Sequence, residues 1–437
     1  MAGPEISQTR LYEWLTGDDD SRMCRDIPDE ACQEQPRNFF LHLAASLGNK
    51  LADELASARL VLPWLLGMIG APLWMVGLLV PIREAGALLP QVFIAGFIRL
   101  KPERKWAWVL GGVLQAIAAG LLALLALFGQ GGVGGALVLA ALVVLSLARG
   151  ISSIATKDVL GKTIAKQRRG TLMGWSGSVA GGVTLAAGGV LVLLGDRPGE
   201  LTLAALLGVA ALGWAVNAFC ASRIEEVPGA VEGGENAWDS IKTGLHLLRD
   251  DHDFLHFNIA RALLLASALA LPYVALLGQQ QSGAELGGLG ILIVVSGLAG
   301  MLASPLWGKR ADASSRRVMR DGGLGTAVGC LLGAAFAWLP GAWSEAVWPY
   351  ALVYALLVIV HSGVRLGRKT YVVDMAGADN RALYVALSNT LTGVLMLAVG
   401  GIVGLLAQWL GSAGLLAVLA LMGLAAAASA QRLPEVE

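Results

Sequence analysis

Residues 107–129 read AWVLGGVLQAIAAGLLALLALFG and contain no charged side chain. A helix needs about 20 apolar residues to cross a bilayer core about 30 Å thick, so this stretch is long enough for one membrane-spanning helix. The whole chain has the same character, because 56% of its 437 residues are hydrophobic and only 15% are charged. Soluble domains carry about 25% charged residues, and this composition therefore excludes an ordinary soluble globular protein.

Twelve stretches of this kind occur, each ended by charged residues or by Gly and Pro. They are residues 39–66, 73–98, 107–129, 136–156, 171–195, 201–221, 254–277, 286–307, 321–340, 346–364, 383–408 and 412–430. The sequence therefore predicts an all-α membrane protein with twelve transmembrane helices. Residues 1–36 contain an acidic run, Asp18 to Asp20, and no apolar segment of the kind found in a cleavable signal peptide.

Basic residues are distributed very unequally between the connections. The connections after spans 2, 4, 8 and 10 each hold a cluster of Lys and Arg, whereas the connections after the odd-numbered spans contain one basic residue in total, Arg197. Positive side chains accumulate on the cytoplasmic side of a membrane. We therefore expect both termini to be cytosolic, in a multi-pass protein of a bacterial cytoplasmic membrane.

The chain divides into two similar halves. A shift of 212 residues places Arg104 and Lys105 on Arg316 and Arg317 without a gap. The predicted parts are a 1–36 cytoplasmic tail, a 37–221 six-helix bundle, a 222–253 linker, a 254–430 six-helix bundle and a 431–437 tail. In the linker, Trp238, Ile241, Leu245 and Leu248 have the spacing of an amphipathic helix on the inner leaflet.

The loops after spans 2 and 8 carry a pattern by which the chain resembles the major facilitator superfamily, whose signature reads G-x-x-x-D-[RK]-x-G-[RK]-[RK]. The second half supplies Gly308, Asp312, Arg316 and Arg317 at the right spacing. The first half supplies Gly96, Lys101, Arg104 and Lys105, but Leu100 stands where the acid belongs. The resemblance implies two parallel six-helix bundles that alternate around a site at the membrane midplane, with these loops forming a cytoplasmic gate.

Eight charged residues lie in the interior of the predicted spans, away from their first and last residues. They are Lys50, Arg59, Arg83, Arg149 and Arg261, with Asp53, Glu54 and Glu84 as the acids. An ionised side chain at the centre of a membrane helix costs about 2.5 to 3.5 kcal/mol, so we expect these groups to face the bundle interior. His361 occupies the repeat position of Arg149 and is a further candidate for this region.

The first span carries most of these charges on one polar stripe. Its members recur every three or four residues: His42, Ser46, Lys50, Asp53, Glu54 and Ser57. In one interpretation Lys50 neutralises the two acids and the cluster is only structural. In the other, Lys50 satisfies one acid and a proton becomes the alternative partner of the second. The spacing does not decide between Asp53 and Glu54, and it places Arg83 across from them on span 2.

Further predictions concern residues elsewhere in the bundles. Arg149 and Arg261 either contact a substrate or extend to the cytoplasmic interface, and the sequence leaves both alternatives open. The glycine pairs Gly177/Gly181 and Gly400/Gly404 indicate close helix packing.

Several classes of function are excluded. The net charge is zero, which argues against a nucleic-acid partner. Cys24 and Cys32 are too few ligands for a metal site, and we expect reduced thiols in a cytosolic tail. The string Gly161 to Thr163 resembles the end of a phosphate-binding loop, but Thr156 stands where that loop needs glycine.

The sequence therefore predicts a monomeric secondary transporter in the lipid bilayer, with no cofactor, no metal and no enzymatic activity. Five basic against three acidic embedded residues favour a small anionic or zwitterionic solute, and the acids of span 1 favour coupling to protons. A lipid translocator and a non-transporting membrane assembly factor remain as alternatives, and the direction of transport is open.

Overall fold

A computed structural model describes residues 12, 27–89, 98, 101–193, 199–228, 249, 251–281, 286–339, 341, 345–376 and 381–436, and this part of the chain is helical and contains no strand. A short helix α2 (Asp29–Gln33) precedes two bundles. The helices of the N-terminal bundle are α3 (Gln35–Leu55), α4 (Val61–Met68), α5 (Leu73–Leu88), α7 (Lys105–Phe128), α8 (Gly131–Thr163), α9 (Lys166–Leu193) and α10 (Gly199–Arg223). Those of the C-terminal bundle are α12 (His252–Leu263), α13 (Ala266–Gln281), α14 (Leu286–Ala313), α15 (Ser315–Trp338), α16 (Val347–Met375) and α17 (Arg381–Gln431).

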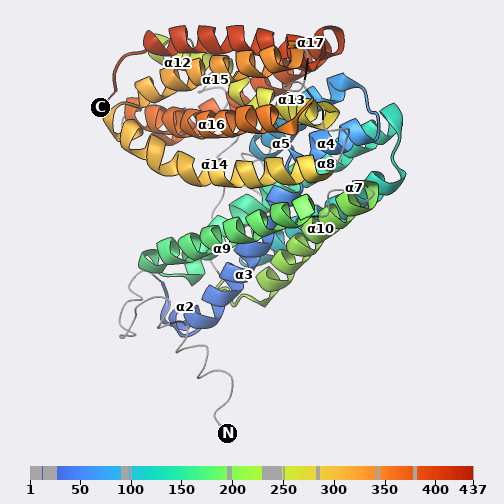
Figure 1. The fold of residues 1–437 in the computed structure, drawn as a ribbon. Helices are drawn as coiled ribbons and strands as arrows, with labels where there is room; N and C mark the ends of the chain where they lie inside the picture. The colour runs from blue at the N-terminus through green and yellow to red at the C-terminus, as the bar shows by residue number, and fades with distance from the viewer. Residues whose placement is uncertain are drawn as a thin grey trace.

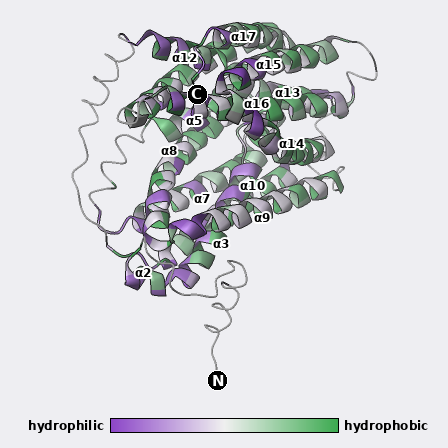
Figure 2. Cartoon of the chain, turned by 90° about the vertical axis from the view of Figure 1, so that its left-hand side faces the viewer, coloured by the Kyte–Doolittle hydropathy of each residue, from purple (hydrophilic) through white to green (hydrophobic). Residues whose placement is uncertain are grey.

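Helices lie in all twelve ranges that the sequence predicts. In the described residues, eight helical segments are long and apolar enough to cross a membrane, and the chain is a helical membrane protein. Figure 2 shows this character as a predominance of hydrophobic residues along the helices, with hydrophilic residues gathered near α2 and the start of α3.

Two of the predicted spans are interrupted rather than continuous. Span 1 is divided into α3 and α4, and span 7 into α12 and α13. At the first break the Ser57 carbonyl oxygen accepts hydrogen bonds from the backbone N–H groups of Leu60 and Leu62, so the helical ladder shifts around Arg59. Conversely, spans 11 and 12 form the single element α17, which bends at Gly411, where φ is 69°. That left-handed conformation favours glycine.

The tenth span is longer than the sequence predicts. We expect it to end at residue 364, but α16 continues to Met375 and therefore contains Arg365, Arg368 and Lys369. Arg and Lys end an apolar run without ending a helix, because both are good helix formers. The charges that the sequence places in a cytoplasmic loop are thus part of a bundle helix.

The two bundles pack against each other through repeat-related helix pairs, α5 with α17 and α14 with α9. Glycines allow the close approach: a Cβ atom at Gly404 would lie 2.5 Å from the Trp74 carbonyl oxygen, and one at Gly290 would lie 2.7 Å from the Gly188 carbonyl oxygen. These two close approaches lie toward the end of the molecule that holds the odd-numbered connections. In Figure 1 the bundles, blue to green and yellow to red, meet at that end and diverge toward the other.

The glycine pairs behave differently from each other. Gly400 and Gly404 pack tightly against α5, as the sequence predicts, since Cβ atoms there would clash with Pro81 and Trp74. Gly181 has no neighbour close enough to touch a Cβ atom, and Gly177 has only the Lys50 ammonium, at 3.5 Å. The prediction of close packing is therefore wrong for Gly177/Gly181 in this conformation, because this part of α9 lies where the bundles diverge.

Two expectations concern the tail and the linker. Cys32 is disulfide-bonded, so the expectation of a reduced thiol is wrong there, whereas Cys220 and Cys330 are free. The expectation was based on a cytosolic location of the tail, whereas the formation of a disulfide also depends on how close the chain brings two cysteines. Cys24, most of the acidic tail and the amphipathic segment around Trp238 lie outside the described residues.

Candidate functional site

Asp53, in the last turn of α3, connects three helices of the N-terminal bundle. Its Oδ1 atom accepts hydrogen bonds from Arg83 of α5 and from Arg149 of α8, the latter at 2.7 Å. The carboxylate is only 19% exposed, so it is held in place by two guanidinium groups away from bulk solvent. The partner that the sequence places across from the acids, Arg83, is therefore present, and Arg149 joins it rather than extending to the interface.

A second ion pair lies beside the first. Arg59, at the break between α3 and α4, donates from Nη2 to Glu84 Oε1 of α5 at 2.7 Å. Arg83 and Glu84 are adjacent in sequence and point about 100° apart, which is why they serve different partners. The Arg59 carbonyl oxygen also accepts from Tyr354 Oη of α16 at 3.4 Å, so the C-terminal bundle contacts this region.

Glu54 differs from the other two acids. It is exposed and makes no hydrogen bond or ion pair with any described residue. Four charged groups nevertheless act on it electrostatically: Asp53 on its own helix, Arg59 at the break, Arg149 of α8 and Arg365 of α16. Glu54 is therefore a carboxylate with positive charges nearby and no fixed partner.

Arg365 and Arg368 of α16 are the functional candidates that sequence reasoning missed. They lie three residues apart and share a helix face with His361, four residues before Arg365. Within the described part of the chain neither arginine has a hydrogen-bond or ion-pair partner. Glu84 and Arg59 of the opposite bundle act on both electrostatically. Continuing the helical period past residue 364 would have revealed this face.

We call these groups the interbundle charge cluster. Its members are Asp53, Glu54, Arg59, Arg83, Glu84, Arg149, Arg365 and Arg368. With five guanidinium groups and three carboxylates, its formal charge is +2. The described residues hold no group of three or more His, Cys, Asp or Glu side chains that could bind a metal ion.

The remaining candidates lie outside the cluster. Lys50 donates to Ser176 Oγ of α9 at 2.8 Å, not to Asp53 or Glu54, so the self-neutralising triplet does not form. Arg261 is only 6% exposed and donates to Asn389 Oδ1 of α17 at 2.9 Å, so it does not reach the interface. His361 bonds Ser267 Oγ through Nδ1 at 3.0 Å, and its Nε2 atom is buried without a partner among the described residues.

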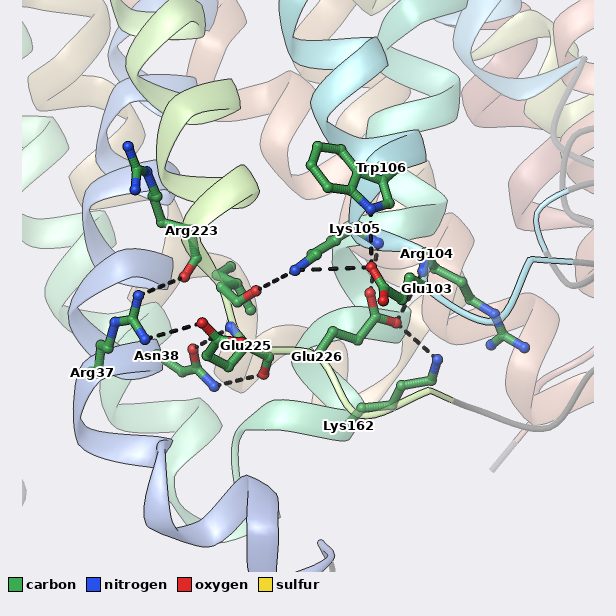
Figure 3. Close-up of polar contacts among 11 residues, drawn as sticks. Arg37, Asn38, Glu103, Arg104, Lys105, Trp106, Lys162, Arg223, Glu225 and Glu226 are labelled. Atoms are coloured by element: carbon green, nitrogen blue, oxygen red, sulfur yellow. Dashed lines mark hydrogen bonds and ion pairs between the residues drawn. The ribbon is translucent and has the colours of Figure 1, made fainter.

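The loop after span 2 is held by a carboxylate from elsewhere in the chain (Figure 3). Glu226, just past α10, accepts from the backbone N–H groups of Arg104 and Lys105 at 3.1 and 2.7 Å, and from Lys162 Nζ of α8 at 2.9 Å. A negative charge there caps the α7 N-terminus. Asp158 of α8 bonds the Arg104 side chain. Gly96 and Leu100 lie outside the described residues, and Glu226 is the described acid that accepts from the backbone of this loop.

The corresponding loop of the second half has a related arrangement. Ser314 caps α15 by accepting from Arg317 N at 3.2 Å. Arg316 donates to the Leu433 carbonyl oxygen at 3.1 Å and pairs with Glu435 at 2.5 Å, so the segment after the last span returns to the loop after span 8. Gly308 lies in α14, and the side chain of Asp312 lies outside the described ones. The hydrogen bonds and ion pairs described for each loop join residues of the same half of the chain.

Comparison with known proteins settles the fold. The structure superimposes on the inward-open xylose transporter XylE from E. coli with a TM-score of 0.65, 12% identity and coverage of 92% of this chain and 97% of that one. The fold is that of the major facilitator superfamily. The nucleoside transporter NupG gives a TM-score of 0.66 at 13% identity, with 90% and 98% coverage. A peptide-bound transporter of the POT family gives 0.67 at 13% identity, with 93% and 98% coverage. No family model and no curated protein matches the sequence.

Proposed function

We propose that this protein is a secondary active transporter that moves a small anionic or zwitterionic solute by alternating access. The observation that carries the proposal is the interbundle charge cluster, which places ionisable groups of both bundles together in a membrane protein of this fold. Charged side chains inside a membrane protein are costly and typically mark a transport pathway. Proteins of known structure with this fold include a xylose transporter, a nucleoside transporter and a POT-family transporter bound to a conjugated peptide.

The proposed topology is twelve membrane crossings with both termini cytosolic. The basic connections then lie inside the cell, and the end where α5 meets α17 and α14 meets α9 faces outward. The bundles diverge toward the cytosol, so this conformation corresponds to an inward-open state. In the outward-open state the same bundles would separate at the outer end and close at the inner one.

Glu54 is the proposed proton-binding residue. Asp53 has two arginine partners and Glu84 has one, so a proton added to either carboxylate would disrupt an ion pair. Glu54 has no such partner, so it can exchange a proton without breaking an ion pair. Lys50 bonds α9 and does not compete for this role.

Two spin-label pairs test alternating access without a known substrate. Phe128→Cys and Leu339→Cys place labels at the outer end of each bundle, and Met173→Cys with Leu306→Cys places them on α9 and α14 where these helices diverge. All four sites are exposed, and the four native cysteines are replaced by alanine. We expect two distance populations for each pair, with reciprocal shifts when the pH is lowered. A single unchanging distance for both pairs would favour the alternative of a non-transporting assembly factor.

A further inference from the structure

We infer that Arg365 and Arg368 form the binding site for an oxyanion group, carboxylate or phosphate, of the transported solute, and that Glu54 competes with that group for Arg365. The inference rests on the proposed transport function and assigns its substrate class. Arg365 and Arg368 lie one turn apart on α16. The same helix reaches the other bundle through Tyr354, whose hydroxyl group donates to the Arg59 carbonyl oxygen.

The arginines of the cluster divide into two kinds. Arg59, Arg83 and Arg149 each donate to a carboxylate of the N-terminal bundle. Arg365 and Arg368 have no partner among the described residues, and their joint charge is balanced only at a distance by Glu54 and Glu84. An arginine side chain presents a planar fork of donors that matches carboxylate and phosphate oxygens. Two such forks without protein acceptors fit an anionic ligand.

The position of Glu54 connects the anion to the proton. An ionised Glu54 is an electrostatic partner of Arg365 and repels an incoming oxyanion. The other charged groups that act on Glu54 are Asp53, Arg59 and Arg149, and all three already take part in ion pairs. When Glu54 takes up a proton, Arg365 loses a competing acceptor and the cluster gains a positive charge. Anion binding and proton binding therefore favour each other, which is a linkage between two sites.

An uncharged or cationic solute fits the same face poorly. Arg365 is exposed in this conformation, but once the bundles close around such a solute, two guanidinium groups would be left without an acceptor, and uncompensated charge inside a membrane protein is costly. The inference thus separates this protein, by substrate class, from the xylose transporters whose fold it shares.

The test is ligand binding to the full-length chain in detergent, measured by thermal stabilisation and microscale thermophoresis without any gradient. The probes are succinate, inorganic phosphate and xylose, each compared with sodium chloride at equal ionic strength. We expect succinate or phosphate, but not xylose, to stabilise the protein, and the two anions distinguish a carboxylate site from a phosphate site. In Arg365→Gln or Arg368→Gln the affinity should fall about tenfold or more.

Two control variants keep the outcome interpretable. Lys309→Gln removes one positive charge from an exposed side chain of α14 outside the cluster and should bind the anion like the parent. Arg365→Lys keeps the charge without the fork and should lie between parent and Gln variant. Since Arg365 and Arg368 have no described partner, both Gln variants should keep the parent melting temperature without ligand.

The inference is overturned if neither anion stabilises the protein more than chloride, or if the Gln variants bind as tightly as the parent. Failure of the transport proposal is a separate result, because the spin-label distances do not depend on anion binding. If the protein binds the anion but shows one fixed conformation, the anion site is supported and the transport proposal is rejected. If the protein shows two conformations but binds neither anion, the transport proposal is supported and the proposed substrate class is rejected.

Discussion

The two bundles share a fold but not the chemistry of the interbundle charge cluster. The N-terminal bundle contributes all three carboxylates and three arginines that pair with two of them, Asp53 and Glu84. Among the described residues, the C-terminal bundle contributes only Arg365 and Arg368, which have no partner there. The string Phe-Leu-His at the start of span 1 recurs in span 7 at a shift of 214 residues, which puts Ser267 and Ala268 at the positions of Asp53 and Glu54. The two halves therefore share helix packing, while the charge cluster is asymmetric, with the proposed proton-binding residue in one half and the proposed anion-binding residues in the other.

The largest expected loss of stability comes from disrupting the ion pairs of the N-terminal bundle. Asp53→Asn removes the acceptor of two partly buried guanidinium groups, and breaking a buried ion pair from one side costs about 3 to 5 kcal/mol. Because Asp53 keeps some exposure, we expect the lower end of that range and a clear drop in melting temperature in detergent.

Glu54→Gln is the matched control for Asp53→Asn, since it removes the neighbouring carboxylate of the same helix. We expect it to leave the melting temperature close to that of the parent, because Glu54 has no described partner to lose. Equal destabilisation by the two substitutions would show that the acids are equivalent and would reject the division between structural and proton-binding carboxylates.

Smaller losses of stability are expected at the loops after spans 2 and 8, where the two halves can be compared. Glu226 has a fully buried side chain and caps the α7 N-terminus, so Glu226→Gln should cost about 0.5 to 2 kcal/mol, as loss of a helix cap does. Glu435, which is 31% exposed, pairs with Arg316, and Glu435→Gln should cost at most about 1 kcal/mol. Melting curves of both variants give the order. A larger loss for Glu435→Gln would contradict the proposal that Glu226 supplies the acid that the first loop lacks.

The helices could be predicted from the sequence because apolar runs and their charged ends are local features. The facing positions of Asp53 and Arg83 could also be predicted, since helical rise and depth determine them. The break at Arg59 could not, because the apolar run continues beyond it and only the backbone hydrogen bonds at Ser57 show where the helix is interrupted. Arg365 and Arg368 were assigned to a loop for a similar reason. Charge ends a hydrophobic run, but only tertiary structure shows that α16 continues beyond it.

Glu226 is a second example of a contact that the sequence pattern could not predict. The sequence shows that Leu100 replaces an acid in the first loop, but a carboxylate more than 120 residues away accepts from the backbone N–H groups of Arg104 and Lys105. Spacing patterns compare neighbouring positions and do not detect such a replacement.

Proton uptake on anion binding tests the central claim most directly. Calorimetric titration of the purified full-length protein with succinate, in two buffers of different ionisation enthalpy at about pH 7.5, gives the number of protons exchanged, because succinate is fully ionised there. We predict net uptake of protons by the parent protein and none by Glu54→Gln, since the anion and an ionised Glu54 compete for Arg365. Succinate binding without proton uptake, or equal uptake by Glu54→Gln, would contradict the account.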